Sequence, residues 1–127
     1  MKKERGIRLG DLQLRIMRVL WDSGTATVAE VQERLGRQRL AYTTVATMLR
    51  KMEERGLVNH LEEGRKFMYR AMVSLHEVTR SMTGDLVDRL FDGSLAATVS
   101  HLLKNREISR EELDRLEQMI QERKSNP

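Results

Sequence analysis

Hydrophobic side chains recur at helical spacing in three successive segments of the first half of the chain. The segments begin near residues 11, 27 and 42, and a glycine follows each of them, at Gly24, Gly36 and Gly56. Glycine adopts the left-handed conformation that ends many helices. The expected inward stripes are Leu12, Ile16, Val19 and Leu20, then Val28, Val31 and Leu35, then Val45, Met48, Leu49 and Met52. We therefore expect three short helices, the first capped by Asp11, with a tight turn between the first two, as in a helix-turn-helix protein.

After Gly56 the pattern changes from helical to alternating. Residues 57–61 and 66–72 alternate apolar and polar side chains, which predicts two strands with Phe67, Tyr69 and Ala71 on one side. The segment between them, Glu-Glu-Gly-Arg at residues 62–65, has the composition of a turn. Three helices followed by one β-hairpin is the order of a winged helix-turn-helix, in which the hairpin is the wing.

Helical spacing returns after Ser74 and continues almost to the end of the chain. Capping boxes of the form Ser/Thr-x-x-Glu at Thr27, Ser74 and Ser109 predict helix starts, because their side chains satisfy amides that a helix start leaves free. The sequence Asp-Gly-Ser at residues 92–94 should break the helix that follows Ser74. These amphipathic helices have no partner domain, and a second copy of the chain is the simplest way to bury their stripes. The predicted dimerisation residues are Val78, Met82, Leu86, Leu90, Leu95, Val99, Leu102, Leu113, Leu116 and Ile120.

The expected architecture is mainly α with a small β-hairpin, divided into a winged-helix domain over residues 1–73 and a helical dimerisation region over residues 74–127. A chain of 127 residues supplies one core of ordinary size. Its 39% hydrophobic and 33% charged residues suit a small helical protein with much exposed surface. No apolar run approaches the roughly 20 residues that cross a bilayer, and no apolar signal core follows the start. We expect a cytoplasmic protein with no membrane partner.

The sequence offers little for catalysis or cofactor binding. It contains no cysteine, which excludes disulfides and thiolate metal sites. His60, His76 and His101 are scattered, which favours ordinary surface or core histidines over a metal site. No nucleophile elbow, phosphate-binding loop or dinucleotide-binding turn is present. We expect no enzymatic activity, no metal and no cofactor.

Basic residues are concentrated in the first part of the chain. Residues 1–75 hold 15 Lys and Arg against 9 Asp and Glu, whereas residues 76–127 hold 8 against 10. This distribution fits a polyanion-binding module joined to a region that need not touch the polyanion. The charge alone is weak evidence, since many basic surfaces are only solvated.

The exposed face of the third expected helix has the residue types of a DNA-reading surface. Threonine bonds to base edges or phosphates, small side chains let a helix sit deep in the major groove, and long cations contact phosphates. The same side chains also suit an ordinary solvent-exposed face. Tyr42 either bonds to a phosphate or packs on the core. The predicted DNA contacts on this helix are Tyr42, Thr43, Thr44, Ala46, Thr47, Arg50 and Lys51.

Four basic residues outside this helix are further candidates. Arg65 and Lys66 lie at the expected hairpin tip, where they either contact a phosphate or minor groove or simply keep the turn hydrated. Arg37 and Arg39 precede the third helix and suit backbone contacts. With a wing behind the helix, we favour DNA binding by residues 1–73. The alternative is a winged-helix module for protein contact that has only non-specific DNA affinity.

Four segments together resemble the penicillinase repressor family, which includes the methicillin-resistance and copper-transport repressors. They are LGDLQLRIMRVLW, AYTTVATMLRKMEERGLV, GRKFMYR and ISREELDRLEQMI, and the resemblance covers nearly the whole chain. It implies a transcriptional repressor that binds a palindromic double-stranded DNA operator as a homodimer, with carboxy-terminal helices that intertwine with those of the second subunit. The reading face that the resemblance implies falls on Tyr42, Thr43, Thr44, Ala46, Thr47 and Lys51.

Three features depart from the family's pattern. Members often place a longer polar residue where Ala46 stands, which implies a different operator preference. In the antibiotic-responsive members a sensor-triggered protease cuts an Asn-Phe bond in the carboxy-terminal helices, and the corresponding pair here is His101-Leu102. The resemblance thus implies a regulatory protease as a partner, whereas the changed pair argues against an unchanged β-lactam signal. The copper-responsive members use carboxy-terminal cysteines, which this chain lacks.

Overall fold

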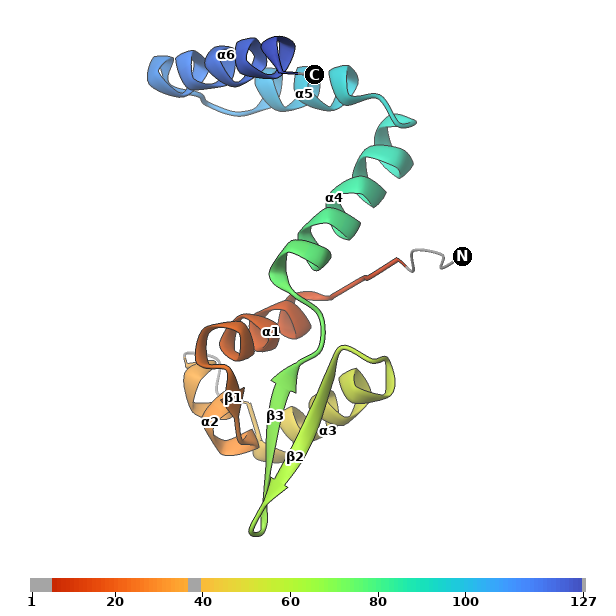
Figure 1. Cartoon of the computed structure of the whole chain (residues 1–127), viewed down its shortest axis with the longest axis vertical. Coiled ribbons are helices and arrows are strands. Elements are labelled where there is room, and N and C mark those ends of the chain that lie inside the picture. The colour runs from red at the N-terminus through yellow and green to blue at the C-terminus, as the bar shows by residue number, and fades with distance from the viewer. Residues whose placement is uncertain (1–5, 37–39, 127) are drawn as a thin grey trace. The chain divides into compact units, whose positions relative to one another are not determined.

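The computed structural model describes residues 6–36 and 40–126, which form two compact units that divide after Asp85. The first unit contains the helices α1 (Asp11–Ser23), α2 (Val28–Arg34) and α3 (Tyr42–Glu54) (Figure 1). It also contains the strands β1 (Thr25–Ala26), β2 (Val58–Glu63) and β3 (Lys66–Ala71). The strands form one antiparallel sheet in the order β1-β3-β2. The prediction of a winged helix-turn-helix is confirmed.

A single hydrophobic core holds the first unit together. The predicted stripes are largely confirmed, with Ile16, Val31, Val45, Leu49 and Met52 inaccessible to solvent. Leu12 and Met48 are only partly buried against this core. Met17, which the predicted stripe of the first helix omitted, is fully buried as well.

The helix starts and ends follow the capping signals with one exception. At α2 the Glu30 amide donates to Thr27 Oγ1 over 3.1 Å, and the Thr27 amide donates to a Glu30 carboxylate oxygen over 2.8 Å. Ser74 and Glu77 make the same reciprocal pair at 3.0 and 2.7 Å. The exception is α1, which is capped by Gly10 and not by Asp11. The Gly10 amide donates to the Gln13 side chain, and its carbonyl already accepts from Leu14, so the helix starts one residue earlier than predicted.

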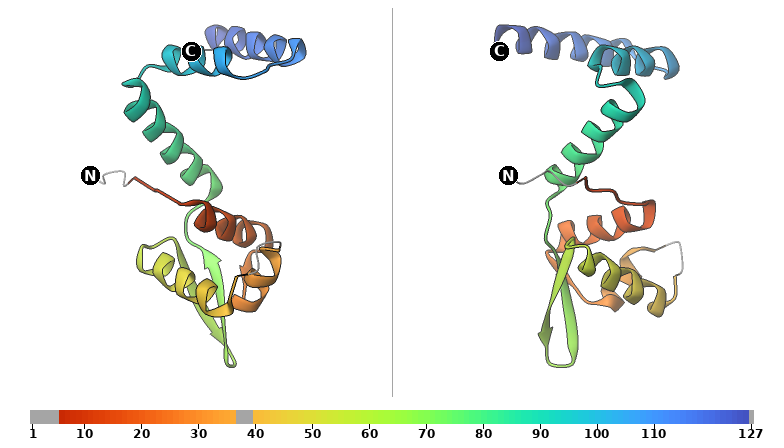
Figure 2. Two further views of the ribbon diagram at one scale, coloured as in Figure 1. Left: turned by 180° about the vertical axis from the view of Figure 1, so that it is seen from behind. Right: turned by 90° about the vertical axis from the view of Figure 1, so that its right-hand side faces the viewer.

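The wing is a tight hairpin that extends beyond the helices of the first unit (Figure 2). Val58 pairs with Ala71 at its base and Glu63 pairs with Lys66 at its tip. β2 is therefore longer than predicted, and only two residues form the turn. Gly64 takes a φ of 64°, a left-handed conformation that a two-residue hairpin turn needs.

β1 was not predicted. Its two residues pair with Arg70 and Tyr69 of β3, directly after α1 ends. A strand this short has no alternating pattern that distinguishes it from a turn.

The helix α4 (Leu75–Phe91) begins in the first unit and ends in the second. Val78, which the sequence analysis placed in the dimer interface, is instead buried in the winged-helix core, and Met82 packs against the same core. The second unit continues with α5 (Leu95–Asn105) and α6 (Arg110–Ser125). The predicted break between α4 and α5 is present, with a φ of 50° at Asp92 and 80° at Gly93. Among the described residues, no helix has the length and apolar character needed to span a membrane.

Candidate nucleic-acid interface

A groove of about 410 Å³ lies between α3 and the wing, at the start of α2. It brings together five of the predicted DNA contacts, which come from segments more than a dozen residues apart. These contacts are Tyr42, Ala46, Arg50, Arg65 and Lys66, and the other lining residues are Thr27, Val28, Ala29, Phe67 and Tyr69. The fold therefore brings these five predicted contacts to one groove, together with residues of α2 and β3 that the sequence analysis did not assign to DNA.

The remaining predicted contacts on α3 lie outside the lining of this groove. Thr43, Thr44 and Lys51 are exposed, and Thr47 is half-buried. The structure thus leaves the helix face open from its first turn to its last. Arg37 and Arg39 lie outside the described residues.

The cations of this surface are available to a polyanion. Arg50 and Lys51 on α3 and Arg65 and Lys66 on the wing are all exposed. Within the described part of the chain, none of the four forms an ion pair. Three of these cations, Arg50, Arg65 and Lys66, line the groove. Such a cluster of positive charge favours binding of a phosphate backbone, because neutralised phosphates release their counterions.

Tyr69 forms part of the groove wall with its ring buried and its hydroxyl neutral. Burial raises the pKa of Tyr69, the negative charge of Glu53 raises it further, and Arg50 opposes the shift. Tyr69 is only 5% exposed and packs in the core of the unit. Tyr69 therefore belongs both to the hydrophobic core and to the lining of the groove, which it shares with Arg50 of α3.

His60, in the third residue pair from the base of the wing, contacts Glu53 of α3. The sequence analysis missed this contact. His60 Nδ1 lies 2.9 and 3.0 Å from the two carboxylate oxygens of Glu53. The His60 ring stacks on Phe67 with centroids 4.0 Å apart and planes inclined by 14°, and Tyr69 lies at 5.5 Å. The three rings share one face of the hairpin, as a two-residue period would indicate. We call His60, Glu53 and Phe67 the wing latch.

The described residues contain no group of three or more His, Asp or Glu side chains that could hold a metal ion. The lining of the groove combines cations, hydroxyl groups and apolar side chains.

A family model described as penicillinase repressor matches residues 9–122 of the chain. The chain belongs to the penicillinase repressor family. The predicted family is thereby confirmed, and membership identifies the chain as a transcriptional repressor and not an enzyme. The match includes the whole winged helix and all but the last few residues of α6.

Individual family members are similar over most of their length. The penicillinase repressor of Bacillus licheniformis is 28% identical over 119 residues, which cover 93% of both chains. The transcriptional regulator BlaI of Mycobacterium tuberculosis is 31% identical over 118 residues, covering 91% of this chain and 84% of the relative. The solution structure of the DNA-binding domain of the repressor BlaI is 29% identical with a TM-score of 0.51, and covers 61% of this chain and 93% of that domain.

Proposed function

We propose that this repressor is a homodimer that binds a palindromic DNA operator, with α3 in the major groove and the wing on the adjacent backbone. The observation that carries the proposal is the groove between α3 and the wing, which is lined by three exposed cations, Arg50, Arg65 and Lys66, that form no ion pair among the described residues. The similarity to the DNA-binding domain of BlaI supports it. We assign DNA binding to residues 1–73 and dimer formation to residues 74–127.

The residues of the interface divide by chemistry into readers and anchors. Thr43, Thr44 and Thr47 carry a hydroxyl and a methyl group each, which suit base edges and the thymine methyl. Ala46 lets the helix approach closely. The anchors, which contact phosphates in this proposal, are Tyr42, Arg50, Lys51, Arg65 and Lys66, with Arg37 and Arg39 beside them in the sequence.

Dimer formation explains the apolar surface of the second unit. Leu90 is 71% exposed, Leu95 is 69% exposed and Ile120 is 54% exposed. Apolar surface of this extent marks an interaction site, and a second copy presents the same surface for mutual burial. The side chains proposed for this interface are Leu86, Leu90, Leu95, Val99, Leu102, Leu113, Leu116 and Ile120.

A regulatory protease is the proposed route of release, and the bond between His101 and Leu102 is its proposed target. Both residues are exposed near the middle of α5. The Asn105 side chain donates a hydrogen bond to the His101 carbonyl over 2.8 Å, which stabilises this turn. Because a protease binds an extended segment, cutting here requires α5 to open locally.

Footprinting on the DNA upstream of the gene for this chain tests the proposal. A repressor protects a defined two-fold symmetric site, and its affinity falls steeply as salt rises. A winged-helix module used only for protein contact would bind DNA weakly and without sequence preference. Uniform, weak protection at every sequence would therefore overturn the proposed function.

A further inference from the structure

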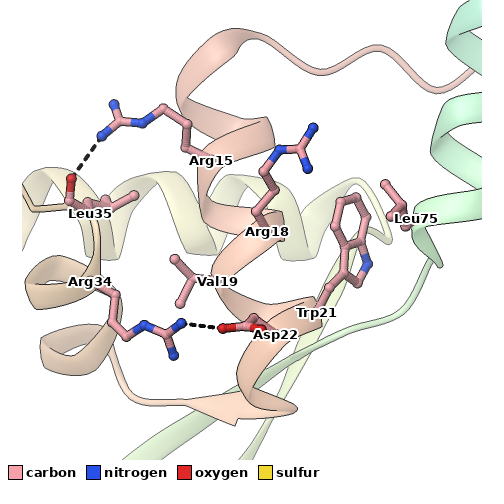
Figure 3. A pocket seen from close by; sticks show the side chains of 8 residues that line it. All are labelled: Arg15, Arg18, Val19, Trp21, Asp22, Arg34, Leu35 and Leu75. Atoms are coloured by element: carbon pink, nitrogen blue, oxygen red, sulfur yellow. Dashed lines mark hydrogen bonds and ion pairs between the residues drawn. The ribbon is translucent and has the colours of Figure 1, made fainter.

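The winged-helix unit contains a second hollow, of about 600 Å³, that shares no lining residue with the groove at α3. It lies between α1, the end of α2 and the first residue of α4 (Figure 3). Its walls combine aliphatic, aromatic and guanidinium groups. The lining residues are Arg15, Arg18, Val19, Trp21, Asp22, Arg34, Leu35 and Leu75.

Three arginines and one aspartate are among the residues that line the hollow. The aspartate is already engaged, since Asp22 forms an ion pair with Arg34. Arg15 Nη2 donates to the Leu35 carbonyl over 2.9 Å, at the end of α2. Arg18 is exposed and makes no hydrogen bond or ion pair within the described part of the chain.

Arg15 and Arg18 are three residues apart on α1, but their guanidinium groups point in different directions, Arg15 toward the Leu35 carbonyl and Arg18 toward the side of Trp21 (Figure 3).

The wall beside Arg18 is aromatic and fixed in place. The Trp21 indole Nε1 donates to the Val73 carbonyl over 2.9 Å, which sets the orientation of the ring. Leu75 is 46% exposed next to it. A fixed indole and an exposed leucine beside a guanidinium group offer a flat apolar surface and an anion-binding fork at one place.

We propose that this hollow binds a small organic anion in which a carboxylate is attached to a flat apolar ring. The carboxylate bonds to the planar fork of Arg18. The ring packs against Trp21 and Leu75, where aromatic contact adds to the burial of apolar surface. This site is independent of the proposed DNA contacts and does not require them.

Trp21 makes the proposal directly testable because it is the only tryptophan in the chain. Benzoate is the probe, with benzamide as a neutral ligand of the same shape and acetate as an anion without a ring. Benzoate should change the Trp21 emission saturably, with a dissociation constant of about 1 mM or tighter, which a ligand of its size can supply. It should also shift the single indole N–H signal in the NMR spectrum.

Arg18→Gln should weaken benzoate binding roughly tenfold or more, because it removes a charge-assisted hydrogen bond without touching the core. The matched control is Arg80→Gln, an exposed arginine of the same unit that does not line the hollow. No saturable response to benzoate would overturn the proposal. An equal response to benzamide or acetate, or unchanged binding in the Arg18→Gln variant, would overturn it as well.

Discussion

Thr47 and Lys51 lie one helical turn apart on α3, yet their surroundings predict different roles in DNA binding. Thr47 is half-buried and short, whereas Lys51 is exposed and makes no ion pair among the described residues. Thr47→Ala should cost about 1 to 3 kcal/mol on the operator and relax one base position, while Lys51→Ala should weaken all DNA and lower the salt slope by about one unit. Titrations of specific and random duplexes at several salt concentrations measure both. Equal losses on specific and random DNA for the two variants would remove Thr47 from the reading surface.

Tyr69 predicts how stability responds to alkaline pH. Burial raises its pKa above the ordinary value of 10.0, so the folded chain holds this proton more tightly than the unfolded chain does. Below about pH 10 Tyr69 is protonated in both states, so its contribution to the free energy of unfolding is constant. Above this pH the unfolded chain loses the proton first, and the free energy of unfolding falls until Tyr69 ionises in the folded chain as well. Denaturant unfolding between pH 8 and 11, as estimated from the ordinary tyrosine range, should show this fall reduced in Tyr69→Phe. If the free energy of unfolding fell equally with pH in the wild type and in Tyr69→Phe, the raised pKa of Tyr69 would be contradicted.

Single residues also show what the sequence could and could not predict. Val45, Leu49 and Met52 were identified as core because a helical period alone determines which face they share. Val78 was assigned to the dimer interface because an apolar stripe from Leu75 toward Leu90 does not tell which helical turns pack on the winged-helix core and which on a second chain. The structure resolves this at Val78, which is 2% exposed within the winged-helix core.

At the scale of elements, the wing latch predicts how rigidly the hairpin is held on α3. His60 and Glu53 are three-quarters and two-thirds buried, at 25% and 31% exposure of their side chains. Glu53→Gln and His60→Ala should each speed amide exchange in the hairpin and weaken DNA binding, with a coupling energy of about 1 kcal/mol in a double-mutant cycle.

Glu62→Gln is the matched control for the latch, because Glu62 is an exposed residue of the same strand. It should leave the amide exchange rates of the hairpin unchanged. It should change the affinity for DNA only as much as the removal of one exposed negative charge does. Additive effects of the Glu53 and His60 substitutions would show that the two side chains do not act together.

Elements defined by local signals were predicted well, and elements defined by distant contacts were not. The capping box at Thr27 and the left-handed Gly56 marked their helix boundaries because their hydrogen bonds stay within a few residues. β1 and the wing latch were missed, since both depend on how a strand crosses a helix or another strand far along the chain. The groove residues were identified from their chemistry, but only the fold brings Tyr42 next to Arg65 and Lys66.

At the scale of the whole molecule, the proposal makes the helices after Ser74 responsible for dimer formation. A chain that ends at His101 lacks the end of α5 and all of α6, and with them Leu113, Leu116 and Ile120. Burial of three such side chains contributes roughly 1.5 to 3 kcal/mol each, so their loss should dissociate the dimer and abolish dimeric operator binding. Analytical ultracentrifugation and operator titrations measure the two effects.

Point variants separate loss of the interface from damage caused by truncation. Leu113→Gln and Ile120→Gln in the full chain place polar groups at exposed positions of α6, so they should dissociate the dimer without unfolding the winged helix. Glu117→Gln on the same helix is the matched control and should leave the dimer intact. A stable dimer of the chain that ends at His101 would contradict the assignment of α6. Cleavage in the host is a separate question, which immunoblotting after β-lactam exposure tests. An intact full-length band with continued repression would indicate a different signal, as the change to His101-Leu102 already suggests.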